Sequence, residues 1–319
     1  MRGPQNPQPK PFFWISLRGE PTKDKPAHHL QFVGFSGRME LEIEVVSEYL
    51  FVGGGQIDLF KNEGREQAYY VFARRGDQLI IPGTSIKGAV RSVAEALSNS
   101  CVKVRARDEK IRSSHEACRD EKELCPACRL LGTTGYRGRV HFTDAIPVGE
   151  VQTHYIKIAD LWPPHQARGR KFYYSKQFQK LDMQPERNHR FLEAVPKGSK
   201  FRTVLYFENT SNAEMGLLIR TLGLDRSTQD KIEYVFPIKL GGAKPRCLGS
   251  VRFIPRGLWL IQAGPDLLTS LAGGGVKTTI TESLLAWLKD MSLLDQEAWK
   301  RFRQEAKLIT EESCPQGVY

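Results

Sequence analysis

A short polar segment of the sequence carries four residues that can bind one metal ion. They form the pattern His-x2-Cys-x6-Cys-x2-Cys and are His115, Cys118, Cys125 and Cys128. Two residues separate the members of each pair, so both side chains of a pair can reach the same ion. Three thiolates and one imidazole complete the tetrahedral shell of zinc and leave no position for a reacting water. The pattern predicts a structural zinc site, with Cys101 as an alternative to His115 as fourth ligand.

The bland interpretation of this segment is a reduced loop with two unrelated pairs. A zinc deaminase is excluded, because its signature is His-x-Glu followed by Pro-Cys-x-x-Cys. Here His115 directly precedes Glu116, and the nearby proline, Pro126, lies inside the cysteine pair. The segment has no apolar core of its own, so we expect a metal ion to fold it.

A basic stretch in the third quarter of the chain is a candidate site for nucleic acid. Between Arg168 and Arg202, ten lysines or arginines stand against three acidic residues, a net +7 of the chain's +11. Cations can follow phosphates while interleaved aromatic rings stack on bases. We predict RNA contacts here, with a solvated surface loop as the alternative. The candidate residues are Arg168, Arg170, Lys171 and Tyr173.

Two smaller places could hold phosphates. A glycine-rich loop combines flexible backbone with cations, and glycine lets N–H groups approach an anion closely. Its candidate residues are Gly241, Gly242, Lys244 and Arg246. The second place is the start of a predicted helix, where free N–H groups favour anions and Lys87 and Arg91 add charge. A plain turn and a solvated helix face are the respective alternatives. Neither the glycine-rich loop nor the glycine run at residues 53–55 matches a nucleotide-binding motif, so no nucleotide cofactor is implied, and we expect no small-molecule substrate.

The composition agrees with a polyanionic partner. The chain has 319 residues and a net charge of +11, with an isoelectric point near 9.4. Such an excess favours nucleic acid through counterion release. No apolar run approaches the roughly 20 residues of a membrane span, and the first residues lack the apolar core of a signal peptide. We therefore expect a cytoplasmic protein without a membrane partner.

The elements that must position these sites alternate between strands and helices. Residues 38–46 alternate apolar and charged side chains, as a half-buried strand does. Ser211 and Glu214 form a capping box at the start of a helix. Apolar positions at helical spacing predict another helix after residue 83, capped by Thr84 or Ser85. The further expected strands are residues 69–73, 139–144, 201–208 and 250–254.

The larger elements run strand, helix, strand, strand, helix, strand, which is the order of a ferredoxin-like, RRM-like fold of the α+β class. Residues 37–265 would form this domain, with a zinc insertion at 99–136 and a basic thumb region at 147–200. Residues 1–36 would be an extended arm anchored by its aromatic residues, and 266–319 a helical segment.

Three motifs in this order resemble the RAMP (repeat-associated mysterious protein) superfamily. Residues 81–91 (IPGTSIKGAVR) resemble its I-P-G-S-S-L-K-G-x-x-R segment. Residues 125–132 with 138–145 are similar to its C-x-x-C-x-L-F-G…G-R-V-x-F-x-D-A segment, and residues 241–249 to its glycine-rich loop. Cys247 stands where that loop usually has glycine.

The resemblance implies a backbone subunit of a CRISPR type III effector complex. Such subunits stack along a guide RNA (crRNA) together with other subunits of the complex and present it for pairing with target RNA. By this resemblance the helix of Lys87 and Arg91 and the glycine-rich loop contact the guide. A thumb, here within residues 147–200, inserts between bases. An RNA-binding or RNA-processing protein outside CRISPR is the other hypothesis.

Some members of this family cleave target RNA with an aspartate between the first strand and the I-P-G segment. Asp58 is the candidate here, and Asp77 is a second option. A carboxylate at this place could hold Mg²⁺ or Mn²⁺ beside the scissile phosphate. A surface carboxylate without chemistry is the alternative, so the sequence leaves endoribonuclease activity open.

Overall fold

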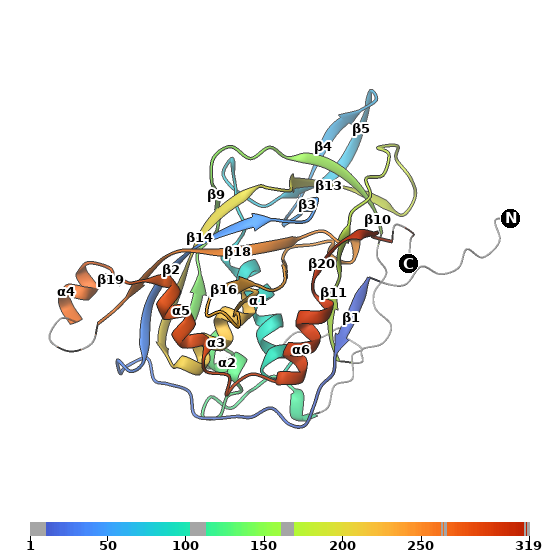
Figure 1. Ribbon diagram of the computed structural model, residues 1–319. Helices are drawn as coiled ribbons and strands as arrows, with labels where there is room; N and C mark the ends of the chain where they lie inside the picture. Colours follow the sequence, from blue (N-terminus) through green and yellow to red (C-terminus); the bar gives the residue numbers. More distant parts are fainter. Residues whose placement is uncertain are drawn as a thin grey trace.

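The centre of the protein is an antiparallel sheet with helices packed on one face (Figure 1). The computed structural model describes residues 11–102, 113–160, 169–262, 264, 267–315 and 317. The strand order is β17-β18-β2-β14-β8, and β19 and β9 pair with β18 and β14. The strands are β17 (Ile238–Lys239), β18 (Ser250–Leu260), β2 (Phe35–Val45), β14 (Lys200–Thr210), β8 (Val140–Phe142), β19 (Val276–Lys277) and β9 (Ile146–Pro147).

The alternation predicted for residues 38–46 is confirmed in β2, the middle strand of this sheet. Met39, Leu41 and Ile43 are completely buried on the face that meets the helices. Glu44 lies on the other face, where its carboxylate accepts hydrogen bonds from Arg252 of β18. Period two thus separates the core from a charged outer face.

Helices from the N-terminal and the C-terminal halves of the chain pack on the apolar face of the sheet. The helix predicted after residue 83 is α1, and the capping box predicted at Ser211 and Glu214 is present at the start of α3. The mixed α+β class is therefore confirmed. The helices are α1 (Gly83–Leu97), α2 (Pro126–Leu131), α3 (Asn212–Thr221), α4 (Leu267–Ala272), α5 (Ile280–Leu288) and α6 (Gln296–Glu305), with short 3-10 turns at Ser113–His115 and Lys244–Arg246.

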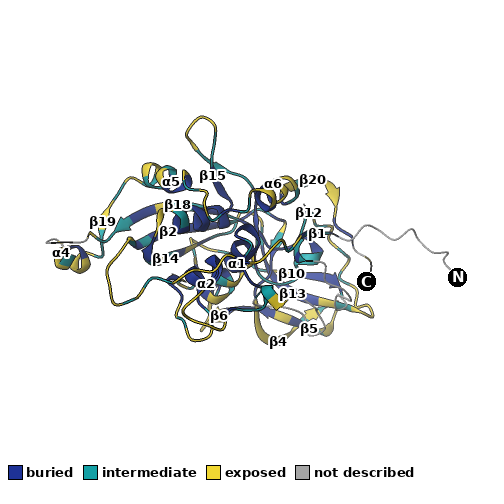
Figure 2. Ribbon diagram, turned by 90° about the horizontal axis from the view of Figure 1, so that it is seen from below, coloured by how far each residue is buried: buried dark blue, intermediate teal, exposed yellow. Residues whose placement is uncertain are grey.

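A second sheet lies beyond the other face of the central sheet and carries a projecting hairpin (Figure 1). The hairpin is formed by β4 and β5, largely exposed along β4 (Figure 2). The predicted thumb region contributes β10 and β13 to the base of this sheet, whereas the projecting strands belong to residues 53–72. The strands are β10 (His154–Ala159), β13 (His189–Pro196), β5 (Arg65–Phe72), β4 (Gly53–Asn62) and β3 (Tyr49–Leu50).

The two terminal segments pack against the central body through short strand pairs. Phe13, from the predicted arm, is buried against Phe172 of β11 and Phe302 of α6. The terminal pairs are β1 (Phe12–Ile15) with β11 (Arg170–Tyr173) and β20 (Leu308–Ser313) with β12 (Ser175–Gln177). Two further short pairs lie within the chain, β15 (Leu224–Arg226) with β16 (Ile232–Tyr234) and β6 (Arg74–Arg75) with β7 (Gln78–Leu79). The domain boundaries expected at residues 36 and 265 stay a prediction. The helices in the described part of the chain are too short or too polar to span a bilayer.

Candidate metal centre and nucleic-acid interface

Four cysteine thiols lie together beneath α1. Cys101, Cys118, Cys125 and Cys128 are buried, and their sulfur atoms all lie within 4.8 Å of one another. The Sγ of Cys101 is 3.4 Å from that of Cys128 and 3.6 Å from that of Cys125. Zinc with four thiolates at bond lengths of about 2.3 Å requires sulfur separations of about 3.8 Å. The group therefore fits one tetrahedral metal ion.

The fourth thiol of this group comes from Cys101, the alternative that the sequence left open, and not from His115. His115 is buried nearby, with its ring nitrogens 3.2 Å from Ser114 Oγ and 3.4 Å from Asn99 Oδ1. Cys101 lies shortly after the C-terminal end of α1, so the position of this helix places its thiol in the cluster.

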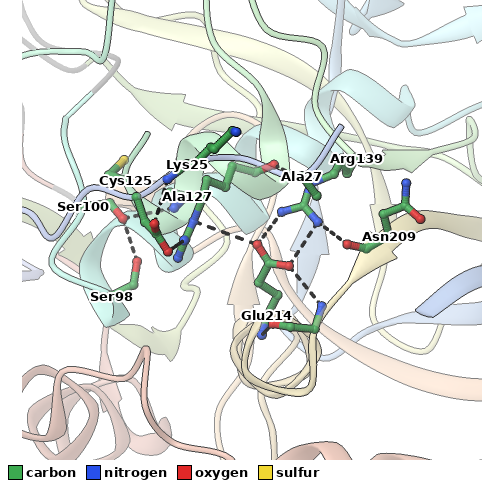
Figure 3. Close-up of polar contacts among 12 residues, drawn as sticks. Lys25, Ala27, Ser98, Ser100, Cys125, Ala127, Arg139, Asn209 and Glu214 are labelled. Carbon is green, nitrogen blue, oxygen red and sulfur yellow. Dashed lines mark hydrogen bonds and ion pairs between the residues drawn. The ribbon is translucent and has the colours of Figure 1, made fainter. Parts of the chain in front are cut away.

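The start of α2 supports the cluster through the main chain. Cys125 caps the helix, Pro126 occupies its first turn, and the N–H of Cys125 points at the sulfur of Cys118 at 3.5 Å. The Ala127 N–H donates to Ser100 Oγ at 3.0 Å, and this hydroxyl also meets that of Ser98 (Figure 3). These contacts connect the start of α2 with the residues that follow α1 on the other side of the cluster.

Arg91 lies beside the cysteine cluster, and its contact with RNA stays a prediction. Its guanidinium is buried, donates to the carbonyl of Gly132 and lies 3.9 Å from the Sγ of Cys128. It also lies 3.4 Å from the carboxylate of Glu95. Burial raises the pKa of Glu95 to about 7, although the charge of Arg91 opposes this.

A buried ion pair joins the cluster to α3. Arg139 donates to both carboxylate oxygens of Glu214 and to the carbonyl of Asn209 (Figure 3). Its Nε donates to the carbonyl of Arg129 in α2, and Glu214 in turn accepts from the Ser211 N–H of its own capping box. The arginine of the G-R-V-x-F segment is thus a structural residue that ties two helices to the sheet.

The first N–H of α1 is occupied by a protein carboxylate. Asp144 Oδ1 accepts a hydrogen bond of 2.8 Å from the Gly83 N–H, and its other oxygen pairs with Arg75. The prediction that Thr84 or Ser85 caps this helix is wrong, since neither side chain makes a cap bond. This end of α1 therefore already holds an anion, and Lys87, half-buried one turn later, is the remaining cation there.

A cavity of about 80 Å³ opens beside α1, and three of the residues that line it are lysines. Lys171 and Tyr173 come from β11, Lys239 ends β17 just before the glycine-rich loop, and Lys244 lies in the 3-10 turn within this loop. Ser92, on the exposed side of α1, lies at its edge, and apolar residues such as Phe13 form its floor. The described residues that line the cavity include no carboxylate, so its charge is uniformly positive.

Desolvation makes the lysines of this cavity receptive to an anion. Burial lowers the pKa of Lys239 to about 7, with a smaller contribution from the charge of Lys244, and burial lowers that of Lys244 as well. The Nζ of Lys239 donates to the carbonyls of Cys247 and Leu248 at 3.2 Å. An anion at this place would restore the favourable solvation that the ammonium groups lose.

The glycine-rich loop is held by close backbone contacts. Gly241 has φ +78°, and a Cβ there would meet the carbonyl oxygen of Phe51 at 2.1 Å. The Gly242 N–H donates to the same carbonyl at 2.8 Å, so it is not free to bind phosphate. Arg246 is buried and donates to the carbonyls of Ala159 and Pro315, among others, and its RNA contact stays a prediction. Lys244 is the cation of the loop that reaches the cavity.

The residue that departs from the family's glycine is used in a cross-link. Cys247 has φ +61°, a conformation that favours glycine, and it forms a disulfide with Cys314 of the C-terminal segment. Arg246 donates to the carbonyl of Pro315, so two adjacent residues fasten this segment to the loop. The sequence carried no signal for this pairing.

The basic stretch is divided between surface and interior. Lys171 and Tyr173 line the cavity, whereas Arg170 is buried and its Nη2 donates to the carbonyl of Ser100. The RNA contact of Arg170 stays a prediction, although its side chain lies in the interior. Arg168 lies outside the described residues. The sequence did not single out Lys239 or Ser92, because their importance arises only when the loop is folded against α1.

Asp58 lies on the exposed strand β4 of the projecting hairpin. Its Oδ1 accepts from the Leu59 N–H at 2.7 Å and its Oδ2 from the Tyr69 hydroxyl at 3.4 Å. Burial raises the pKa of Tyr69, so this hydroxyl stays a donor. In the described ranges, the cysteine cluster is the one group of three or more potential ligands arranged for an ion. Asp77 is exposed in the turn between β6 and β7.

The comparison with protein families agrees with the positions of these sites. A model described as the RAMP superfamily matches residues 42–252, which include α1, the cysteine cluster and the glycine-rich loop. The chain belongs to the RAMP superfamily, and it is thus an RNA-binding module of the CRISPR-associated type. No curated protein matches the chain. The strand β1 and the helices α5 and α6 lie outside the matched range.

Proposed function

We propose that this chain is a guide-RNA-binding backbone subunit of a type III CRISPR ribonucleoprotein in the cytoplasm. The observation that carries the proposal is the cavity beside α1, where Lys171, Lys239 and Lys244 come together from two separate parts of the described chain. Cations in a desolvated groove bind the RNA backbone whatever its sequence. Base pairing between guide and target would then supply the specificity.

Two features of the fold support this role. The central strands follow the order β18-β2-β14-β8, and of these four strands β2 precedes α1 in the chain and β14 precedes α3. This order is that of a ferredoxin-like domain, which binds single strands in the RRM. The exposed side of α1 carries Thr84, Gly88 and Ser92 at helical spacing, so a backbone can approach the helix there.

The cysteine cluster would hold zinc in a structural role. Its thiolates would complete the shell of the ion and fix α2 and the residues around it. The position of the ion beneath α1, away from the lysine cavity, gives it no contact with RNA. Zinc would therefore stabilise the fold of the insertion, and other residues would bind the RNA.

The experiment that tests the proposal is sequencing of the RNA that copurifies with the tagged chain from its own cells. Uniform short RNAs with repeat-derived 5′ ends, together with other subunits of the complex and target RNA, are the expected result. A diffuse mixture of cellular RNA would instead favour an RNA-binding or RNA-processing protein outside CRISPR. Absence of RNA would overturn the proposal.

A second function, cleavage of target RNA, rests on the exposure of Asp58. Its carboxylate projects from the hairpin and makes no ion pair with the described residues, so Mg²⁺ or Mn²⁺ shared with a phosphate could bind it. The Asp58→Ala variant should assemble normally and lose metal-dependent cleavage. The Glu66→Ala variant, which removes an exposed carboxylate from β5 of the same hairpin, is the matched control. Equal cleavage by wild type and Asp58→Ala would exclude this function.

A further inference from the structure

Arg170 is buried in a way that hydrogen bonds within the protein do not explain. It begins β11 and is 6% exposed. Its Nη2 donates to the carbonyl of Ser100, but its Nε and Nη1 are buried and have no hydrogen-bond partner among the described residues. A buried cation with unsatisfied donors is strongly destabilising unless negative charge lies close to it. The residues around Arg170 therefore indicate which group supplies the negative charge that it needs.

The cysteine cluster can supply that negative charge. The thiols of Cys101 and Cys125 act on the charge of Arg170, as do the carboxylates of Glu95 and Asp295. On the other side of the cluster, the Nη1 of Arg91 lies 3.9 Å from the Sγ of Cys128. A divalent ion bound by four thiolates carries a net charge of −2. Two buried arginines next to the cluster would balance it.

We propose that the metal-bound cysteine group is a dianionic centre with Arg91 and Arg170 as its counter-ions, and that Arg170 thereby positions the β11 side of the lysine cavity. The link runs along one short strand, because Lys171 and Tyr173 follow Arg170 in β11 and line the cavity. The second half of the proposal rests on the proposed RNA function, since it concerns the affinity of that cavity for RNA.

The other contacts of β11 show why this anchor matters. Among the described strands, β11 pairs only with β1, where Arg170 lies opposite Ile15, and Phe172 packs on Phe13 and Phe302. These contacts hold the middle of the strand, whereas Arg170 holds its first residue. Without metal the thiols become neutral, so Arg170 loses its counter-charge. The start of β11 would then move out toward water and take Lys171 with it.

The experiment measures two affinities of the full chain, one for zinc and one for RNA. Zinc affinity is measured by competition with a coloured chelator, and RNA affinity by the fluorescence anisotropy of a labelled single strand. The variants are Arg170→Gln, which removes the charge, and Arg170→Lys, which keeps it. Lys231→Gln, an exposed cation in the turn between β15 and β16, is the control for a change in total charge. Circular dichroism checks that each variant is folded.

We expect Arg170→Gln to weaken zinc binding roughly tenfold or more, as residues next to metal ligands do, and Arg170→Lys to recover part of it. Removal of zinc from the wild type should weaken RNA binding, and zinc should restore it. Unchanged zinc affinity in Arg170→Gln would overturn the counter-ion assignment. RNA binding that does not depend on zinc would overturn the link to the cavity. A wild type that binds no RNA would overturn the proposed function itself, and the zinc titration would still decide the counter-ion assignment.

Discussion

The carboxylate of Asp144 accepts a hydrogen bond of 2.8 Å from the backbone N–H of Gly83, so a residue of the G-R-V-x-F-x-D-A segment caps the helix of the I-P-G segment. The two motifs are separated by about 60 residues of sequence, which include the cysteine cluster. The Asp144 side chain reaches the Gly83 backbone because β8 lies beside α1 in the folded chain. The Gly83 N–H, one of the helix-start N–H groups predicted to bind an RNA phosphate, therefore already has an acceptor within the protein.

Replacement of Asp144 by alanine should lower the free energy of unfolding by about 1 kcal/mol, because the Gly83 N–H loses its acceptor. The ion pair with the exposed Arg75 adds little to this value. Urea unfolding followed by circular dichroism measures the change. Asp144→Asn keeps an acceptor oxygen and should lose only a few tenths of a kcal/mol. An alanine variant as stable as the wild type would show that this cap is not used.

The disulfide between Cys247 and Cys314 closes a separation of 67 residues. A cross-link of this span restricts the unfolded chain and should contribute about 4 kcal/mol to stability. Cys314→Ser should therefore unfold at lower urea concentration than the oxidised wild type, and a reductant should bring the wild type to the same midpoint. Thiol counting under denaturing conditions provides the check. Two more free thiols than the cluster supplies, in protein purified without reductant, would contradict the pairing.

Local sequence patterns were sufficient for the elements that build the central sheet. The alternation through Met39, Leu41 and Ile43 marks a buried face, and the Ser211 and Glu214 capping box marks a helix start. Both signals depend on residues within a few positions of each other. The strand and the helix start that they predict therefore form independently of distant parts of the chain.

The roles of the arginines could not be read in the same way. Arg91, Arg170 and Arg246 stand in basic stretches, but each is buried against partners far away in the sequence. A basic residue is normally exposed, so its burial depends on tertiary contacts that no local pattern encodes. The same reason hid the role of Cys101, whose spacing from Cys118 is unlike that of a local ligand pair.

The buried pair of Glu214 and Arg139 should be one of the most sensitive places in the fold. Glu214→Ala would leave the guanidinium of Arg139, 1% exposed, without its carboxylate. Loss of one partner of a buried ion pair costs about 3–5 kcal/mol. Thermal unfolding measures the change, and Glu297→Ala, in the first turn of α6 and exposed, is the matched control. The double variant Arg139→Met with Glu214→Ala should be more stable than Glu214→Ala alone, and a further loss would contradict this explanation.

RNA affinity should decrease as the pH rises above 7, because the lysine cavity must be protonated to bind phosphate. The pKa of Lys239 is lowered to about 7 by burial in the free protein, and a bound phosphate favours the charged form and raises it. Between these two values, RNA binding takes up a proton, so affinity falls by up to about tenfold for each pH unit. Anisotropy titrations between about pH 6 and pH 9 measure this slope. Lys239→Gln should bind RNA more weakly at pH 6 and show a flatter profile, whereas Lys231→Gln should keep the slope of the wild type. A profile in Lys239→Gln as steep as that of the wild type would assign the proton to another group.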